Sequence, residues 1–183
     1  MQPAASDSGS SKQNRAPLTG TRISSGVILA KAPRVKANEA ETADMDPVTL
    51  TTNRLLMRPW LPEDREPFFA INCEPAVDRH LGPLTRDKSD AMIDRANESF
   101  AEHRWGRWAL EERETGALIC HCGFMPVHAN LPFAPGVEVG WRLSGRWQGK
   151  GLARESAEAA LQFGFDTAGF DRIVAYTTPA NTE

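Results

Sequence analysis

The sequence is poor in cysteine and lacks long apolar runs, and both shortages narrow the class of protein. Only three cysteines occur among 183 residues, Cys73, Cys120 and Cys122. A small, odd number does not build the disulfide framework of a secreted domain, so we expect a reducing, cytoplasmic location. No apolar run approaches the roughly 18 residues of a membrane span, and the apolar segment 26–30 is too short for a signal-peptide core.

Charge is unevenly distributed along the chain. Residues 1–44 carry six basic and four acidic groups, whereas residues 45–183 carry fifteen and twenty, which gives net charges of +2 and −5. A domain of net charge −5 has no general electrostatic attraction for nucleic acid or an anionic membrane. Neither is therefore expected as a partner, and a small cationic or amine ligand is more compatible with this balance.

The first 46 residues differ in composition from the rest. They show no hydrophobic period and are rich in Ser, Ala and Pro, which predicts a disordered N-terminal extension. An alternative is a transit peptide, because no acidic residue occurs between Ser8 and Asn38. Met45 directly precedes the more regular part of the chain, so it is also a candidate translation start.

The tripeptide Cys120-His121-Cys122 admits a metal-binding or a packing interpretation. On a regular strand the two thiols would share one face and His121 would point to the other. No second Cys/His pair at ligand spacing follows, and His128 is isolated. We therefore expect these residues to fill a strand, with no metal bound.

Hydrophobic periodicity predicts a single mixed domain. In the longest expected helix, Met92, Ala96 and Phe100 recur every four residues, and Thr85 is a plausible N-cap. Pro62 suits the first turn of an earlier helix, which Pro67 would bend or interrupt. Strands are expected over residues 51–58, 105–112, 117–124, 137–143 and 171–178, and helices over residues 62–72, 87–103 and 152–165. The order β-α-α-β-β-β-α-β indicates an α/β (α+β) fold with a mixed, mostly antiparallel sheet flanked by helices.

The most informative segment follows the strand at residues 137–143. Val137, Val139, Trp141 and Leu143 would form one face of that strand, with Glu138, Gly140 and Arg142 on the other. Arg146-x-x-Gly149-x-Gly151 follows, and a helix begins at once. The glycines permit a tight turn, while the helix adds free N–H groups and the positive end of its dipole, a combination that suits a pyrophosphate.

Three nucleotide-binding loops share this strand–loop–helix arrangement. A Walker A loop needs Gly-Lys-Ser/Thr after its four-residue spacer, but Gly145 precedes Arg146 and Trp147. The dinucleotide fingerprint needs a third Gly or Ala where Arg154 stands. The coenzyme A loop, Gln/Arg-x-x-Gly-x-Gly/Ala, remains.

With this loop the sequence resembles the GNAT acetyltransferase superfamily, and within it the branch of the ribosomal-protein N-terminal (alanine/serine) acetyltransferases. The resemblance extends from about residue 50 to the end of the chain and keeps the family's order of segments. Those segments are Thr52-Asn-Arg-Leu-Leu-Met-Arg-Pro-Trp60, Leu61-Pro-Glu-Asp64, Trp108-Ala-Leu-Glu-Glu-Arg-Glu-Thr-Gly-Ala-Leu-Ile119, Val137-Glu-Val-Gly-Trp141 and Thr178-Pro-Ala-Asn181.

The resemblance implies a GNAT acyl-CoA N-acyltransferase fold over residues 47–183. In this family a serine, a helix and two strands usually follow the segment ending at Asn181, and the sequence stops at Glu183. We therefore expect a C-terminally truncated domain whose final helix and strands are missing.

The resemblance also implies acetyl-CoA as co-substrate. It would lie where the strand at residues 137–143 separates from the last strand, with its diphosphate on main-chain N–H groups of residues 148–153. Arg146 and Lys150 either add charge there or are solvated loop cations. The implied cofactor-binding residues are Val139, Trp141, Arg146, Gln148, Gly149, Lys150, Gly151, Leu152, Ala153 and Asn181.

Acetyl transfer to an amine needs a base, an oxyanion donor and a proton for the departing thiolate. Glu138 is the candidate general base, although it could instead be the structural partner of Arg142 or Arg58. A main-chain N–H near Val139 or Trp141 would stabilise the oxyanion. Because the family's serine is absent, Tyr176 is the alternative thiolate donor, unless it only packs on the sheet.

Three functions follow from these features. The leading hypothesis is an acetyl-CoA-dependent N-acetyltransferase that acts on a protein N-terminus or a small-molecule amine by direct attack in a ternary complex. The second is a catalytically incomplete acyl-CoA-binding remnant. The third is a module whose last strand is completed by a partner chain. Tryptophans 105 or 108 are candidates for lining the acceptor pocket.

Overall fold

The computed structural model describes residues 19–23, 27–31, 48–78 and 84–177. Met45, Asn181 and most of the expected N-terminal extension therefore lie outside the described residues. For residues 19–23 and 27–31 the backbone pairing is described.

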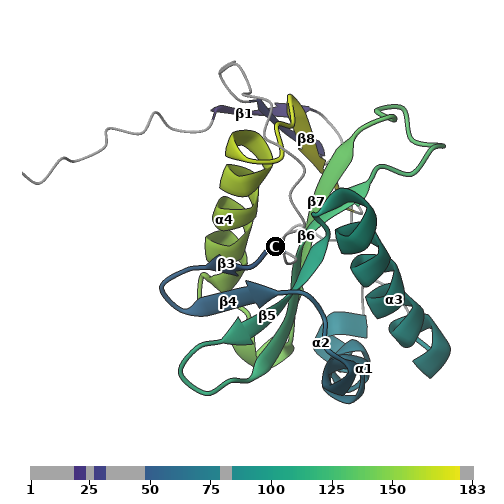
Figure 1. Cartoon of the computed structure of the whole chain (residues 1–183), viewed down its shortest axis with the longest axis vertical. Coiled ribbons are helices and arrows are strands. Elements are labelled where there is room, and N and C mark those ends of the chain that lie inside the picture. Colours follow the sequence, from purple (N-terminus) through teal and green to yellow (C-terminus); the bar gives the residue numbers. More distant parts are fainter. Residues whose placement is uncertain (1–18, 24–26, 32–47, 79–83, 178–183) are drawn as a thin grey trace, which may run out of the picture.

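A single mixed sheet organises the chain (Figure 1). Its strand order is β1-β2-β8-β7-β6-β5-β4-β3, and every neighbouring pair is antiparallel except the parallel pair β7–β8. The strands are β1 (Thr19–Ile23), β2 (Val27–Lys31), β3 (Leu50–Thr51), β4 (Leu55–Arg58), β5 (Arg107–Glu112), β6 (Leu118–Pro126), β7 (Val137–Leu143) and β8 (Arg172–Ala175). The mixed, mostly antiparallel α/β fold predicted from the sequence is confirmed.

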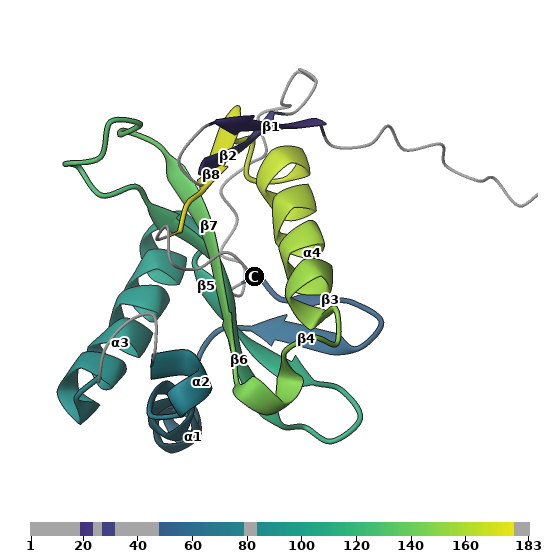
Figure 2. The same cartoon turned by 180° about the vertical axis from the view of Figure 1, so that it is seen from behind.

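Helices cover both faces of the sheet, as the front and back views show (Figures 1 and 2). One face carries α1, α2 and α3, and the opposite face carries α4. The helical segments are η1 (Pro62–Asp64), α1 (Arg65–Asn72), α2 (Pro75–Asp78), α3 (Arg86–His103), η2 (Gly145–Trp147) and α4 (Leu152–Asp166). Among the described residues, none of these helices is both long and apolar enough to cross a membrane.

Local signals placed most helix ends correctly. The backbone N–H of Lys88 donates to Oγ1 of Thr85 at 3.4 Å, so Thr85 is the N-cap of α3 as predicted. The predicted interruption at Pro67 is wrong. Helix α1 begins at Arg65, which puts Pro67 in the first turn, where a missing N–H costs no helical hydrogen bond.

The strand predicted over residues 51–58 is instead a short hairpin of β3 and β4. The N–H of Thr52 donates to the carbonyl of Leu55 at 2.9 Å, and Oγ1 of Thr52 accepts from the N–H of Leu55 at 2.9 Å. The threonine side chain thus closes a tight turn by bonding to the backbone. Such local bonds compete with continuation of the strand, and apolar periodicity does not reveal them.

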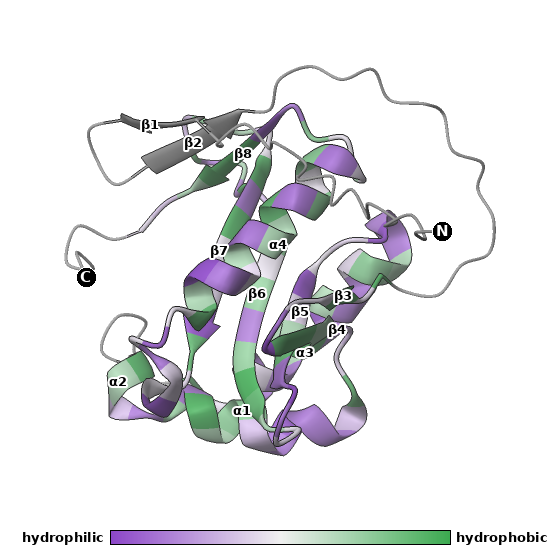
Figure 3. Cartoon of the chain, turned by 90° about the vertical axis from the view of Figure 1, so that its left-hand side faces the viewer, coloured by the Kyte–Doolittle hydropathy of each residue, from purple (hydrophilic) through white to green (hydrophobic). Residues whose placement is uncertain are grey.

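Two apolar cores lie on the two faces of the sheet. The core beneath α4 is built around Trp108, Phe124 and Phe163, whose rings meet edge to face. The core beneath α1 and α3 includes Trp60, Phe68 and other buried side chains. Figure 3 shows apolar and polar residues alternating along α4, as expected for a helix that buries one face on a sheet.

A β-bulge in β6 breaks the alternation assumed for Cys120-His121-Cys122. The register with β5 shifts between Leu110 and Glu111, and Cys120 has a φ of 130°. As a result Cys120 joins the core beneath α1 and α3, while Cys122 joins the core beneath α4. The expectation that both thiols share a face is wrong, because the extra residue of a bulge reverses the side to which the following residues point.

The hairpin β1–β2 lies within the segment for which disorder was predicted. Strand β2 pairs antiparallel with β8, for example Ile28 with Ala175 and Lys31 with Arg172. The prediction of uniform disorder over residues 1–46 is therefore wrong for residues 19–23 and 27–31. The short apolar run there shows no period of its own, and pairing with the sheet edge supplies its structure. The domain boundary at residue 47 stays a prediction.

Close packing of α4 on the sheet predicts an unusual response to Gly164→Ala. A Cβ atom at Gly164 would lie 2.8 Å from Cδ1 of Ile173 and 2.8 Å from Cζ of Phe124. Glycine to alanine in a helix ordinarily stabilises by about 1 kcal/mol. Here we expect overpacking to outweigh that gain, with a net loss of about 1–2 kcal/mol in the free energy of unfolding measured in urea. A variant as stable as the wild type would contradict this packing.

Candidate functional site

The loop between β7 and α4 has a backbone that requires glycine. After η2 the chain passes through Gly149 with a φ of 71° and Gly151 with a φ of 77°. A Cβ atom added at Gly149 would meet nothing within 4 Å, so conformation and not space demands glycine there. Gly151 is the N-cap of α4 and gives it no side-chain hydrogen bond.

Main-chain N–H groups accumulate in this loop without acceptors. Within the described part of the chain, no carbonyl or side chain accepts from the N–H groups of Gly149, Lys150, Gly151, Leu152 and Ala153. They stand at the N-terminus of a 15-residue helix, whose dipole adds positive potential. Such a set can hold an anion.

Gln148 differs from its neighbours in the predicted set. Its N–H already donates to the carbonyl of Gly145 at 3.3 Å, and its side-chain Nε2 donates to the carbonyl of Leu143 at 3.0 Å. Gln148 thereby closes η2 and joins the end of β7 to the loop. The main-chain N–H of Gln148 is therefore not available to a ligand, because it already donates a hydrogen bond within the 3₁₀ turn.

Two cations flank the loop. Arg146 and Lys150 are exposed, and each lies over the ring of Trp147, at 5.5 Å and 4.6 Å from the ring centroid. Neither forms an ion pair with a carboxylate among the residues that the structure describes. Both interpretations, phosphate ligands and solvated cations, remain compatible with this placement.

A salt bridge that sequence reasoning missed attaches the loop to the β3–β4 hairpin. Nη2 of Arg54 lies 2.7 Å from Oε2 of Glu155 in the first turn of α4, and Nη1 of Arg54 donates to the carbonyl of Lys150 at 3.0 Å. Burial raises the pKa of Glu155, but the hydrogen bonds from Thr52 and Arg54 and the charge of Arg54 lower it more, so it lies below its ordinary value. Nothing in the sequence joins residues this far apart.

Glu74 fixes the other end of the loop. Its carboxylate accepts from Oγ of Ser144 at 2.7 Å and from the N–H of Gly145 at 2.6 Å. The loop is therefore held from both sides before any ligand arrives, which reduces the entropy lost on binding.

The edge of β7 is open beside this loop. Parallel pairing with β8 is confined to Val137 with Ile173 and Glu138 with Val174, whereas β6 pairs with β7 along its whole length. Beyond Glu138, no strand of the described residues pairs with the backbone of β7 on its β8 side. Val139 points into the core, and Trp141 is 46% exposed.

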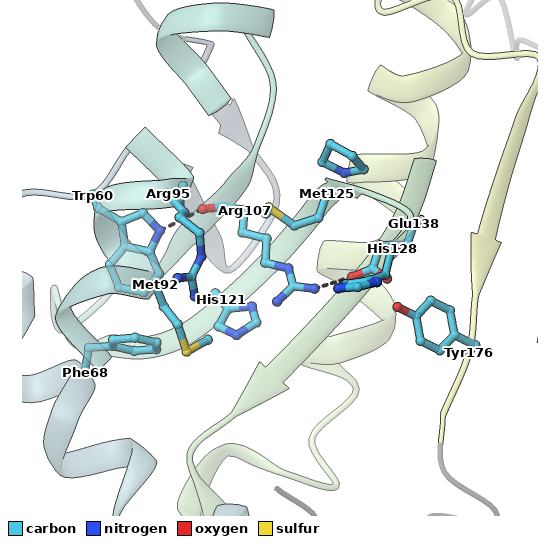
Figure 4. A pocket seen from close by; sticks show the side chains of 12 residues that line it. Trp60, Phe68, Met92, Arg95, Arg107, His121, Met125, His128, Glu138 and Tyr176 are labelled. Atoms are coloured by element: carbon cyan, nitrogen blue, oxygen red, sulfur yellow. Dashed lines mark hydrogen bonds and ion pairs between the residues drawn. The ribbon is translucent and has the colours of Figure 1, made fainter. Parts of the chain in front are cut away.

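A cavity of about 260 Å³ lies on the face of the sheet that carries α1 and α3 (Figure 4). Strands β5, β6 and β7 supply its polar wall, and α1 and α3 supply much of its apolar wall. Its lining comprises Trp60, Phe68, Met92, Arg95, Ala96, Arg107, His121, Met125, Pro126, His128, Glu138 and Tyr176. Trp60 lines it, and neither Trp105 nor Trp108 does; Trp108 is buried on the opposite face.

Glu138 forms its ion pair with Arg107, through Nη2 of the arginine and Oε1 of the carboxylate. Both partners weighed from the sequence are wrong. Arg142 donates to Oδ1 of Asn72, and Arg58 is paired with other carboxylates. Glu138 and Arg107 lie on strands that are not neighbours, and Gly140, whose added Cβ would lie 3.3 Å from Arg107, gives the guanidinium room.

Tyr176 lies just after β8, and its hydroxyl points toward Glu138 (Figure 4). Burial, followed by the hydrogen bond and charge of Glu138, raises the pKa of Tyr176 to about 12. Its ring also contacts Phe133, with centroids 5.3 Å apart. Both expected roles, a proton donor and a packing residue, are compatible with this position.

His121 is buried in the wall of the cavity beside Trp60 and Phe68. Neither ring nitrogen has a hydrogen-bond partner among the described residues. Burial, and then the charges of Arg107 and Arg142, hold the pKa of His121 well below its usual value. The imidazole is therefore neutral, with two unused polar atoms.

The cysteines next to it are buried and form no disulfide. Burial raises the pKa of Cys120 and of Cys122 to about 12, so both remain thiols near neutral pH. Within the described ranges, no group of three or more His, Cys, Asp or Glu side chains could hold a metal ion.

The buried neutral imidazole predicts a pH dependence of stability. Because the folded-state pKa of His121 lies below the unfolded value of about 6.5, the unfolded chain binds the proton first and the free energy of unfolding falls as pH falls below 6.5. Between pH 7 and pH 5 we expect the free energy of unfolding, measured in urea, to fall by about 1–2 kcal/mol more for the wild type than for His121→Leu. His128→Leu, at an exposed position, is the control for the loss of an imidazole. Identical slopes for wild type and His121→Leu would contradict this.

Comparisons with known proteins show which family this chain shares with its relatives. The model of the GNAT acetyltransferase domain matches residues 54–183. The uncharacterised N-acetyltransferase p20 of Bacillus licheniformis is 31% identical over 138 residues, which cover 73% of this chain and 75% of that protein.

Solved structures give the same result. An acetyltransferase from Agrobacterium tumefaciens superposes with a TM-score of 0.65 at 26% identity, covering 78% of this chain and 81% of that one. A GNAT-family acetyltransferase from Bacillus anthracis shares the fold with a TM-score of 0.61 at 23% identity, covering 74% and 76%. These likenesses do not separate the ribosomal-protein branch from other GNAT enzymes. The chain belongs to the GNAT family of N-acetyltransferases, enzymes that transfer an acetyl group from acetyl-CoA.

Proposed function

We propose that this chain transfers the acetyl group of acetyl-CoA to a primary amine by direct attack in a ternary complex. The observation that carries the proposal is the row of five free main-chain N–H groups at residues 149–153, beside the open edge of β7. The acceptor is a protein N-terminus or a small-molecule amine. A ribosomal-protein N-terminus, the acceptor class of the branch that the sequence resembles, and a cytoplasmic location belong to this proposal and not to the findings above.

The free N–H groups would bind the diphosphate, and Arg146 and Lys150 would add charge on either side. The pantetheine arm would pair with the open backbone edge of β7 near Val139 and Trp141, as an added strand does. The loop geometry fits this role, because positive φ angles at two glycines turn successive N–H groups toward one side. Asn181 stays an expectation from the family resemblance.

A neutral amine in the cavity next to the strand opening would attack the thioester carbon with its lone pair, while a main-chain N–H of β7 stabilises the oxyanion. As the carbon–nitrogen bond forms, Glu138 accepts one proton from that nitrogen, directly or through one water. As the carbon–sulfur bond breaks, the thiolate takes a proton from the Tyr176 hydroxyl. Glu138 returns its proton to Tyr176, so the amine's proton ends on the thiol and no tyrosinate remains.

The other two hypotheses make different demands. A partner chain that completes the sheet would need the outer edge of β8, but β2 of the same chain pairs there. A catalytically incomplete remnant would bind acetyl-CoA without turnover. Calorimetric titration followed by thiol release with a panel of amines separates the remnant from the enzyme.

Gly149→Ala tests the loop, with Gly116→Ala as a matched control. Both glycines have a φ of 71° and open space around the missing Cβ, so both substitutions should cost about 1 kcal/mol of stability. Only Gly149→Ala should weaken acetyl-CoA binding, by about tenfold, because it redirects the N–H groups. An unchanged dissociation constant by calorimetry would count against the loop as the diphosphate site.

Glu138→Gln tests the base. We expect kcat to fall by about 100-fold, with loss of the acidic limb of the pH–rate profile, and acetyl-CoA affinity to stay unchanged. Steady-state rates between pH 5 and 9 give the profile, and calorimetry gives the affinity. A profile of unaltered shape would remove Glu138 from this role.

A further inference from the structure

The acceptor cavity has a charge opposite to that of the domain around it. Its charged lining residues are Arg95, Arg107 and Glu138, so cations outnumber anions. Arg95 has no hydrogen bond or ion pair with any described residue. Arg107 gives one amino group to Glu138, while its buried Nε has no partner among the described residues. Within this part of the chain, one positive charge in the cavity is therefore uncompensated.

Position as well as charge singles out Arg107. The indole Nε1 of Trp60 donates to the main-chain carbonyl of Arg107 at 2.7 Å, which fixes the backbone from which the side chain extends. In Figure 4 the guanidinium lies between His121 and Glu138, at the centre of the cavity. His121 adds two ring nitrogens beside it that have no partner among the described residues. Buried polar atoms without partners cost free energy, so these atoms favour a polar ligand in the cavity.

The other wall of the cavity is apolar. Trp60 and Phe68 have ring centroids 4.7 Å apart, and Met92 and Ala96 project from α3 beside them. The volume of about 260 Å³ lies below the roughly 300–1,000 Å³ typical of sites for drug-sized ligands. A small molecule with one apolar side and one anionic group matches both walls.

We propose that the acceptor is a free amino acid with an apolar side chain, and that its carboxylate displaces Glu138 from the ion pair with Arg107. The inference rests on the proposed acetyl transfer. Arg107 and Arg95 bind the carboxylate, Trp60 and Phe68 contact the side chain, and the amine meets Glu138. Oε1 of Glu138 is occupied by Arg107 beforehand, and a substrate that brings its own carboxylate frees that oxygen to accept the amine's proton, whereas a plain amine does not.

Three matched sets of amines test this with the wild-type chain. Leucine, methionine and phenylalanine are each compared with their C-terminal amide, their decarboxylated amine and a dipeptide that begins with the same residue. We expect kcat/KM for each amino acid to exceed that of its partners by at least tenfold. The amide is the sharpest comparison, because its amine loses a proton more easily than that of the free amino acid and chemical reactivity alone would favour it. Equal or higher kcat/KM for the amides, amines or dipeptides would overturn the proposal, and a preference for the dipeptides would point to protein N-termini.

Variants test the exchange at Arg107. Arg107→Gln should raise KM for leucine at least tenfold and abolish the preference over 3-methylbutylamine, because Glu138 is then free with either acceptor. Arg95→Gln should raise KM for leucine with little change in kcat. Arg86→Gln, on the same helix but outside the cavity, is the control and should keep wild-type constants. A preference for leucine that survives in Arg107→Gln, with folding verified by thermal unfolding, would contradict the exchange.

The two proposals fail in different ways. Turnover of decarboxylated amines at rates equal to those of amino acids would defeat the inference and leave acetyl transfer intact. A chain that neither binds acetyl-CoA in calorimetry nor releases thiol with any amine would defeat both.

Discussion

The separation of β7 from β8 after two paired residues is the constraint on which the rest of the site depends. Strand β6 pairs with β7 along its full length while β8 pairs with only two of its residues, so one backbone edge of β7 has no strand partner among the described residues. The same strand leads into the glycine loop and carries Glu138 on the opposite face from α4. The glycine loop and the cavity are thereby both attached to one strand, as the proposed direct transfer between two bound molecules requires.

Much of this arrangement could be predicted from the sequence, because the signals were local. The alternation over residues 137–143 gave the limits of β7, and the spacing of Gly149 and Gly151 gave the turn before α4. The N-cap at Thr85 is equally local. Where competing local interactions were present, prediction was weaker: the Thr52 turn split a strand, and a bulge at Cys120 reversed the sides of the residues that follow.

The parts that could not be predicted are contacts between distant residues. Glu138 was correctly placed on the polar face of its strand, but its partner lies two strands away in the sheet, and several arginines compete for that role in the sequence. The salt bridge from Arg54 to α4 and the hydrogen bond from η2 to Glu74 also join residues that lie far apart in the sequence. The charge of the cavity could not be inferred from the net charge of the domain, because three side chains determine it locally.

The pairing of β2 with β8 joins the two ends of the described chain. Ile28 lies opposite Ala175, so forming this ladder closes a loop that contains most of the described residues. Since the entropic cost of closing a loop grows with its length, whereas the hairpins of the central sheet are local, these contacts are expected late on the folding pathway. During synthesis the first hairpin must wait until β8 has been translated before its sheet partner exists.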